Sequence, residues 1–85
     1  MNIDEQIAKV LEILNKLDYE AALQEQTEDS YYIWWWDRRV SHYMAHGTFH
    51  KGSKYSFGVY GMSFKDYETA IAAFEEYVTF YRKFS

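Results

Sequence analysis

The first part of the chain spaces its apolar residues with the period of an α-helix. Apolar residues recur at steps of three and four, which puts them on one helix face. This stripe comprises Ile3, Ile7, Val10, Leu14 and Leu17, with Leu11 at its side. Asn2 and Glu5 have the spacing of a capping box, with Asn in place of the usual Ser or Thr. We predict a helix that begins after Asn2 and ends near Asp18.

The next dozen residues carry a weaker pattern. Tyr19, Ala21 and Leu23 alternate with other residues, as in a strand, but the Ala and Glu residues suit a helix equally well. Residues 19–23 are therefore interpreted either as an extension of the first helix or as a short strand. Residues 24–30 are predicted to form an acidic loop.

After residue 30 the pattern changes to the period of two that is typical of β-strands. The alternation predicts three strands joined by two turns, and Gly61 ends the series. The strands are predicted over residues 31–36, 40–49 and 54–60, with turns at 37–39 and 50–53.

The first predicted strand has the sequence YYIWWW, in which five of six residues are aromatic. Because alternate side chains of a strand point to opposite faces, the run divides into two sets. One set is Tyr31, Ile33 and Trp35, and the other is Tyr32, Trp34 and Trp36. A register shift of one residue would exchange the two sets. One face can belong to the core, whereas the second must be covered or serve as a binding surface.

Beyond Gly61 the chain returns to helical spacing. Ser63 is predicted to cap the last helix, with Asp66 at the third position, where a carboxylate interacts favourably with the exposed amides. Arg82 and Lys83 suit the last turn of this helix. The apolar stripe comprises Phe64, Tyr67, Ile71, Phe74, Val78 and Tyr81, flanked by Ala70, Ala73, Tyr77 and Phe80.

These elements predict an α+β fold, a two-layer α-β-β-β-α sandwich with an antiparallel three-stranded meander. A fourth short strand before Tyr31 is left open. Both helices are expected on one sheet face, covering Tyr43, Ala45, Phe49, Tyr55, Phe57 and Val59. The other face would carry His42, Met44, His46, Ser56, Tyr60 and half of the aromatic run.

The length of 85 residues predicts a single domain over 1–85. The 21% content of aromatic residues supports a folded domain, because each buried ring removes a large apolar area from water. There is no cysteine, so no disulfide or thiolate metal site braces the fold. No signal peptide or membrane-spanning apolar stretch is evident. We therefore expect a soluble cytoplasmic protein without a membrane partner.

Charge is segregated along the chain. Residues 1–30 hold eight acids and two lysines, residues 31–65 hold five basic residues and one acid, and residues 66–85 hold four acids and two basic residues. The formal net charge of −4 argues mildly against a general nucleic-acid binder. The basic middle third keeps nucleic acid open as a partner.

The three histidines His42, His46 and His50 are four residues apart. On a helix two such histidines can share a zinc ion. On a strand, which the alternation favours here, four residues span about 13 Å, so no two of these histidines could reach one metal ion. The more ordinary interpretation is three partly exposed histidines. The chain also has no cysteine nucleophile, no glycine-rich phosphate loop and no Ser-His-acid motif. We expect a non-enzyme without catalytic residues, metal or cofactor.

The basic residues gain interest from the predicted topology. In a three-stranded meander the first turn and the start of the last helix lie at one sheet end, which would bring Arg38, Arg39 and Lys65 together. Lys51 and Lys54 would lie at the opposite end. Equally, Arg38 and Arg39 would simply keep a turn beside three tryptophans soluble.

The α-β-β-β-α order with this basic cluster resembles the double-stranded-RNA-binding domain. The resemblance implies RNA contacts through the first helix, the first β-turn and the start of the last helix. In this chain the last helix opens Phe64-Lys65-Asp66, with one lysine at that place.

The opening residues carry a second resemblance. Met1-Asn2-Ile3, Ile7, Asn15-Lys16 and Asp18-Tyr19 are similar to the start of a small acidic type II anti-CRISPR family from phage. That family places a short helix before a three-stranded sheet and ends in a helix. It inhibits the effector nuclease by presenting acids where DNA would bind. The resemblance implies a phage inhibitor of a host protein.

Three functional hypotheses follow. The first is a protein-binding module, most concretely a phage-type or mobile-element inhibitor of a host protein, because aromatic residues and Arg dominate interface energetics. Its expected contact residues are Tyr32, Trp34, Trp36, Arg38, Arg39, Tyr60, Glu25, Glu28 and Asp29. The second is a nucleic-acid-binding domain that stacks bases on the aromatics or grips a backbone with Arg38, Arg39 and Lys65. The third is a homodimer in which two aromatic faces pair.

Overall fold

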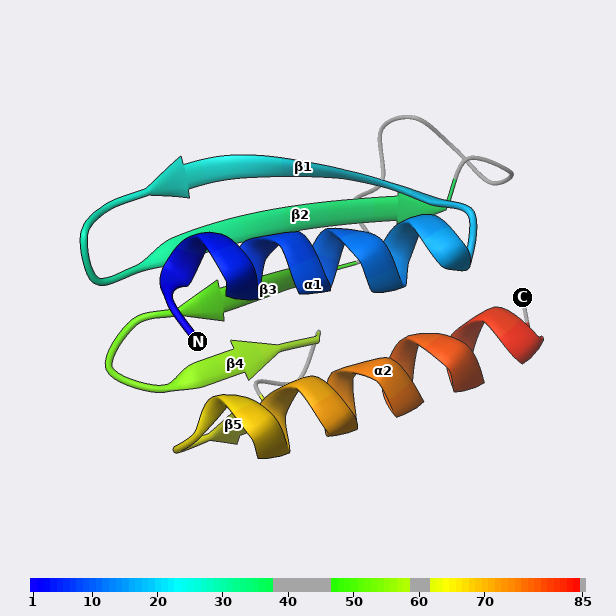
Figure 1. The fold of residues 1–85 in the computed structure, drawn as a ribbon. Helices are drawn as coiled ribbons and strands as arrows, with labels where there is room; N and C mark the ends of the chain where they lie inside the picture. Colours follow the sequence, from blue (N-terminus) through cyan, green and yellow to red (C-terminus); the bar gives the residue numbers. More distant parts are fainter. Residues whose placement is uncertain (38–46, 59–61, 85) are drawn as a thin grey trace.

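The computed structural model describes residues 1–37, 47–58 and 62–84, which form two helices and five strands (Figure 1). In chain order the elements are α1 Ile3–Lys16, β1 Tyr19–Gln26, β2 Tyr31–Asp37, β3 Gly47–Lys51, β4 Tyr55–Phe57, β5 Met62–Phe64 and α2 Tyr67–Phe84. The strands make one antiparallel sheet in the order β1-β2-β3-β4-β5. Every strand therefore pairs only with its neighbours in the sequence.

Both helices lie on the same face of the sheet (Figure 1). Helix α1 packs on β1 and β2, helix α2 packs on β4 and β5, and the two helices also contact each other. The predicted α+β arrangement, with two helices covering one face of an antiparallel meander, is confirmed. The strand number differs from the prediction, because the described residues contain five strands rather than three or four.

The core between the sheet and the helices is built mainly from aromatic rings. Phe74 of α2 meets Trp35, Phe49 and Phe57 edge-on, with centroid distances of 5.3, 5.0 and 5.4 Å. Such edge-to-face pairs each add about 0.5–1.5 kcal/mol beyond the burial of area. Because the three partners come from β2, β3 and β4, the Phe74 ring packs α2 against three strands at once.

Helix α1 forms as its sequence predicts. The Asn2 Oδ1 atom accepts a hydrogen bond from the Glu5 backbone N–H at 2.8 Å, which satisfies an amide that the helix leaves free. The apolar stripe is buried at Ile7, Val10 and Leu14. Asp18 then takes a left-handed conformation with φ of 62°, which Asp tolerates better than most residues, and the chain turns into β1.

The acidic loop predicted for residues 24–30 was largely wrong. Residues 19–23, left open between helix and strand, belong to β1, and the strand continues through Gln26. Only residues 27–30 form the turn, in which the Thr27 backbone N–H donates to the Ser30 carbonyl oxygen at 2.8 Å. Pairing with β2 decides in favour of a strand, because β2 supplies hydrogen-bond partners along its whole length.

The later boundaries also differ from the prediction. His50 and Lys51 belong to β3 rather than to the turn, which is confined to 52–54. Strand β4 is only Tyr55–Phe57, and the short strand β5, Met62–Phe64, was not predicted at all. Residues 38–46 and 59–61 lie outside the described part, and with them His42, Tyr43, Met44, Ala45, His46, Val59 and Tyr60.

The predicted cap of the last helix was wrong. Ser63 lies in β5, and α2 begins at Tyr67. Asp66 is the residue that caps it, since its carboxylate accepts from the Thr69 backbone N–H at 2.9 Å and from the Thr69 hydroxyl. The Thr69 N–H, and then the hydroxyl, lower the pKa of Asp66 below its ordinary value. Asp and Ser have similar preferences for the N-cap position, so the local sequence alone did not distinguish Asp66 from Ser63 as the cap.

Strand β5 reverses the chain once more before α2 begins. The register pairs Phe64 with Tyr55, Tyr55 with Lys51, and Lys51 with Tyr31, the first residue of β2. Lys65 therefore follows β5 at the sheet end where β2 starts. This is the end that also holds Lys51.

Of the predicted grouping of Arg38, Arg39 and Lys65, the structure describes only Lys65. Asp37, the residue that precedes Arg38, ends β2 at the opposite sheet end, roughly 20 Å from Tyr31 at strand spacing. Arg38 and Arg39 lie outside the described residues. The α-β-β-β-α order that carries the resemblance to the double-stranded-RNA-binding domain likewise gains two strands here.

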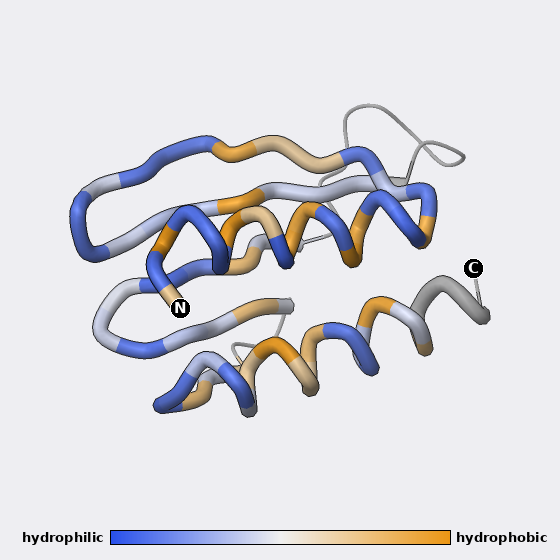
Figure 2. The backbone as a smooth tube through the Cα atoms, in the orientation of Figure 1, coloured by the Kyte–Doolittle hydropathy of each residue, from blue (hydrophilic) through white to orange (hydrophobic). Residues whose placement is uncertain are grey.

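The distribution of hydropathy explains why the sheet is less evident in the sequence than the helices. In Figure 2 strong hydrophobic residues mark both helices, whereas β2 is mostly pale and the turn between β1 and β2 is blue. Tyr and Trp have polar atoms as well as large apolar rings, so they score as nearly neutral. No helix in the described ranges is long and apolar enough to cross a bilayer.

Candidate functional site

Consecutive residues of β2 differ sharply in exposure. Tyr31 and Ile33 are fully buried and Trp35 is 1% exposed, whereas Tyr32 keeps 37% and Trp34 keeps 44% of their surface in solvent. The division predicted from strand alternation is confirmed for these five residues. The buried set faces the helices, and the exposed set faces away from them.

We use the term open face for the sheet surface turned away from both helices. Directly paired residues of neighbouring strands project to the same side, and the described members of this face are Glu20, Ala22, Glu25, Tyr32, Trp34, Trp36, Thr48, His50, Ser56 and Ser63. These described strand positions include no lysine or arginine. The open face is therefore aromatic along β2 and acidic along β1.

Tyr32 packs against a neighbouring aromatic ring on β3. Its ring stacks on the His50 imidazole with a centroid distance of 4.0 Å and an interplanar angle of 13°. The two residues are direct cross-strand partners in the register. One face of the phenol ring is thus covered by imidazole, and the other face is turned toward β1.

Trp34 stands between two small neighbours. Its cross-strand partners are Ala22 on β1 and Thr48 on β3. Neither side chain is tall enough to cover an indole ring, which accounts for the 44% exposure of Trp34. A large aromatic group above small neighbours has the form of an interface anchor.

Trp36 differs from Trp34 because its polar edge is engaged. The indole Nε1–H donates a hydrogen bond of 2.6 Å to the Glu20 carboxylate, and the side chain is half-buried. Glu20 is the direct partner of Trp36 in the register. This pair fixes one corner of the open face, and the Glu20 carboxylate already serves as a hydrogen-bond acceptor.

Glu25 lies directly opposite Tyr32 on β1, beyond an irregularity in the strand. The register shifts between Leu23 and Glu25, so Gln24 is an extra residue of the bulge type. Gln24, Glu25, Tyr32 and Trp34 together line a hollow of about 320 Å³. We call it the β1–β2 hollow.

Two further acids, Glu28 and Asp29, lie in the exposed turn between β1 and β2. The turn is ordered by Thr27, whose hydroxyl accepts from the Asp29 and Ser30 backbone N–H groups at 3.3 and 3.0 Å. Lys51 Nζ donates to the Asp29 carbonyl oxygen at 2.7 Å. Glu28 and Asp29 thus lie at the sheet end where β1 passes into β2, next to the Lys51 ammonium group.

The predicted contact residues are only partly brought together. Tyr32, Trp34, Trp36 and Glu25 share the open face, and Glu28 and Asp29 lie at its end. Arg38, Arg39 and Tyr60 fall outside the described residues.

Sequence reasoning missed Glu20, Gln24 and His50. Glu20 and Gln24 were missed because β1 was not recognised over its length, and His50 because it was assigned to a turn. The alternation of Tyr19, Ala21 and Leu23 was the signal that would have revealed β1.

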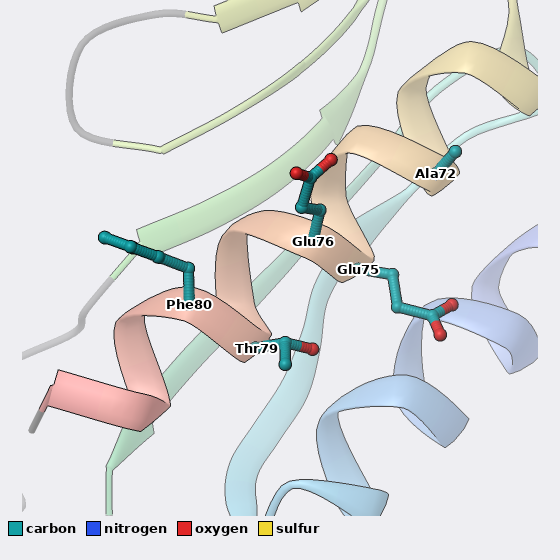
Figure 3. Close-up of a pocket in the computed structure, with 5 residues that line it drawn as sticks. All are labelled: Ala72, Glu75, Glu76, Thr79 and Phe80. Atoms are coloured by element: carbon teal, nitrogen blue, oxygen red, sulfur yellow. The ribbon is translucent and has the colours of Figure 1, made fainter.

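A second hollow lies elsewhere, along the solvent side of α2. It measures about 580 Å³ and is lined by Ala72, Glu75, Glu76, Thr79 and Phe80 (Figure 3). These residues all come from consecutive turns of one helix, and Figure 3 shows the two carboxylates diverging rather than converging. This surface is a solvated helix face whose described polar side chains do not converge on one point.

A buried polar network lies on the covered side of the sheet. The Tyr31 hydroxyl donates to the Gln6 Oε1 atom at 3.0 Å, and Gln6 Nε2 donates to the Tyr55 hydroxyl at 3.3 Å. Burial raises the pKa of Tyr31, and it raises the pKa of Tyr67 to about 12. Both phenols are therefore neutral at ordinary pH, and the network ties α1 to β2 and β4 without offering an acid or base to solvent.

In the described ranges, no three His, Asp or Glu side chains lie close enough together to hold a metal ion. His50 is engaged in its stack on Tyr32, and His42 and His46 lie outside the described residues. The chemistry on offer at the open face is therefore that of aromatic rings and carboxylates.

No protein-family model, curated protein or solved structure matches this chain. What the chain binds is therefore inferred from its own surface. That surface combines exposed rings on β2 with carboxylates on β1 and in the following turn.

Proposed function

We propose that this protein is a non-enzymatic binding module that recognises a protein partner through the open face. The observation that carries the proposal is the exposure of Tyr32 and Trp34 on a sheet face that neither helix covers. Interfaces draw most of their energy from a few aromatic anchors that become desolvated in the complex. Trp34, above Ala22 and Thr48, and Tyr32, backed by His50, are anchors of this kind.

The acidic residues near the exposed rings indicate that the partner has a basic surface. Glu20, Glu25, Glu28 and Asp29 border the aromatic residues, so a basic surface would be attracted at a distance and aligned on contact. In its most concrete form the proposal is a phage-type or mobile-element inhibitor that covers a basic site on a host protein. This form rests on the acidic border and on the resemblance of residues 1–19 to anti-CRISPR proteins.

Nucleic acid is the weaker alternative. Exposed rings can stack on bases, but each base brings a phosphate, which the acids on β1 and in the turn would repel. The partners for phosphates in that hypothesis were Arg38, Arg39 and Lys65, and Lys65 lies at the sheet end opposite to the one where β2 ends. The observations therefore favour a protein partner.

The test compares the wild type with the Tyr32→Ala, Trp34→Ala double variant in affinity capture from a host lysate. We expect capture of a specific protein by the wild type and its loss in the variant, with both proteins melting at nearly the same temperature. The matched control is Phe80→Ala, which removes an exposed ring on α2 and should leave capture unchanged.

Two other results would overturn the proposal. Binding of labelled oligonucleotides at low salt, falling steeply as salt rises, would assign the open face to nucleic acid. A homodimer in light scattering that the double variant dissociates would show that a second copy covers the open face.

A further inference from the structure

We infer that the β1–β2 hollow receives an arginine side chain of the partner protein. This inference rests on the proposed function and names the group that the open face recognises. The hollow lies where the aromatic row of β2 meets the acidic row of β1, and it is lined by Gln24, Glu25, Tyr32 and Trp34. Two rings, a carboxylate and an amide therefore border one space.

The rings offer π surfaces to a cation. Tyr32 has one ring face covered by His50, at a centroid distance of 4.0 Å, so its other face is the one that borders the hollow. Trp34 follows on the same side of β2 and is 44% exposed. A guanidinium group placed over a Trp or Tyr ring is attracted by the ring quadrupole, most strongly where water is displaced.

Glu25 supplies the opposite charge. It is directly opposite Tyr32 in the register, and within the described part of the chain its carboxylate takes part in no hydrogen bond or ion pair. Glu20, on the same strand and the same face, already accepts from the Trp36 indole. Of these two residues, Glu25 is the one that lines the hollow.

The combination fits arginine better than lysine. A planar guanidinium can lie against an aromatic ring while its edge donates two parallel hydrogen bonds to one carboxylate. The compact ammonium of lysine holds its hydration more strongly and cannot make both contacts in the same way. The Gln24 side-chain oxygen offers a further acceptor beside Glu25.

The probe is a short blocked peptide with two arginines, compared with its lysine and citrulline counterparts. Citrulline keeps the planar shape of arginine and removes the charge. Binding is followed by NMR through the backbone N–H signal of Tyr32, which also lines the hollow and is present in every variant, at an ionic strength of about 0.15 M, at which long-range attraction is screened. We expect the arginine peptide to bind and the lysine peptide to bind several-fold more weakly. The citrulline peptide should bind at least about tenfold more weakly, because it has lost the charge that Glu25 and the rings attract. A tenfold change corresponds to about 1.4 kcal/mol of binding free energy.

The variants locate the site. Glu25→Gln and Trp34→Leu should each weaken binding of the arginine peptide by about tenfold. Glu75→Gln is the matched control, since it makes the same change of charge at an exposed carboxylate of α2, away from the β1–β2 hollow. It should change binding by less than about twofold, and circular dichroism should show all three variants folded.

The outcomes separate this inference from the proposed function. Equal weakening by Glu25→Gln and Glu75→Gln would reduce the effect to the net charge of the protein and overturn the hollow as a site. Equal binding of the three peptides, or no binding, would overturn arginine as the ligand, while Trp34-dependent capture of a protein would still support the proposed function. Hollow-specific peptide binding without any captured protein would support the arginine site and count against the proposed function.

Discussion

Trp34 and Trp35 are adjacent in the sequence and identical in chemistry, yet they lie in opposite environments. Trp35 is 1% exposed and packs its ring against Phe74 of α2, whereas Trp34 is 44% exposed above Ala22 and Thr48. The difference arises because successive strand residues point to opposite faces and both helices lie on one of them. The same residue type therefore stabilises the fold at one position and remains available for binding at the next.

The largest difference between the two tryptophans is expected when each is replaced by alanine. Trp35→Ala should lower the free energy of unfolding by about 3–5 kcal/mol, because it leaves a large cavity in the core. Trp34→Ala should lower it by less than about 1 kcal/mol, as is usual for exposed positions. Chemical denaturation measures both values, and a similar loss in the two variants would mean that the open face is covered.

A smaller effect is expected at Gly47, the residue paired with Trp35. A Cβ atom at Gly47 would lie 2.7 Å from the Trp35 Cζ2 atom and 2.8 Å from Cη2, so Gly47→Ala pushes against a buried ring. We expect a loss of about 1–3 kcal/mol in the free energy of unfolding. On the open face, Thr48→Val should change it by about 0.5 kcal/mol or less.

A double-mutant cycle tests the cause of the Gly47 effect. In a Trp35→Phe background the smaller ring leaves space for the added methyl group, so Gly47→Ala should cost less than it does beside Trp35. An unchanged cost would assign the effect to backbone conformation at Gly47 instead.

A gain in stability, rather than a loss, is expected at a buried phenol on the covered side. The Tyr67 hydroxyl is buried and has no hydrogen-bond partner in the described part of the chain, so Tyr67→Phe should raise the free energy of unfolding by about 1 kcal/mol. Denaturation at neutral pH measures the gain. A loss of stability would mean that the hydroxyl is hydrogen-bonded, for example through a water molecule.

The same hydroxyl predicts an alkaline limit to stability. Burial raises the pKa of Tyr67 from an unfolded value of 10.0 to about 12, and it raises the pKa of Tyr31 as well. Because the folded pKa is the higher one, the stability contribution is complete below pH 10 and is lost as pH rises from about 10 through about 12. Unfolding curves across this range should show the decline, and Tyr67→Phe should make it shallower.

The elements that the sequence predicted well are those whose evidence is local. The cap at Asn2 and the stripe of Ile7, Val10 and Leu14 define α1 without reference to the rest of the chain. The two sets of residues in β2 follow from strand alternation alone. The identity of the open face required only the further expectation that both helices lie together.

The elements that the sequence did not reveal are those that depend on a partner strand. β1 is exposed over its second half and carries Glu20 and Glu25, so its composition suits a loop until β2 pairs with it. β5 has three residues, too few for a periodic signal, and it moves the start of α2 to Tyr67 and Lys65 to the other sheet end. The site on the open face was incomplete for the same reason, because half of it belongs to β1.

The sequence by itself thus determined the first helix, the α+β class and which tryptophans of the run point together, since these depend on spacing between near neighbours. The tertiary structure alone decided that Glu25 lies opposite Tyr32, that Glu20 binds Trp36, and that Lys65 lies at the sheet end where β2 starts. Cross-strand pairing joins residues that are distant in the chain, and its register is fixed by hydrogen bonds and packing across the whole sheet. Those pairings are what place a carboxylate beside the exposed aromatic rings.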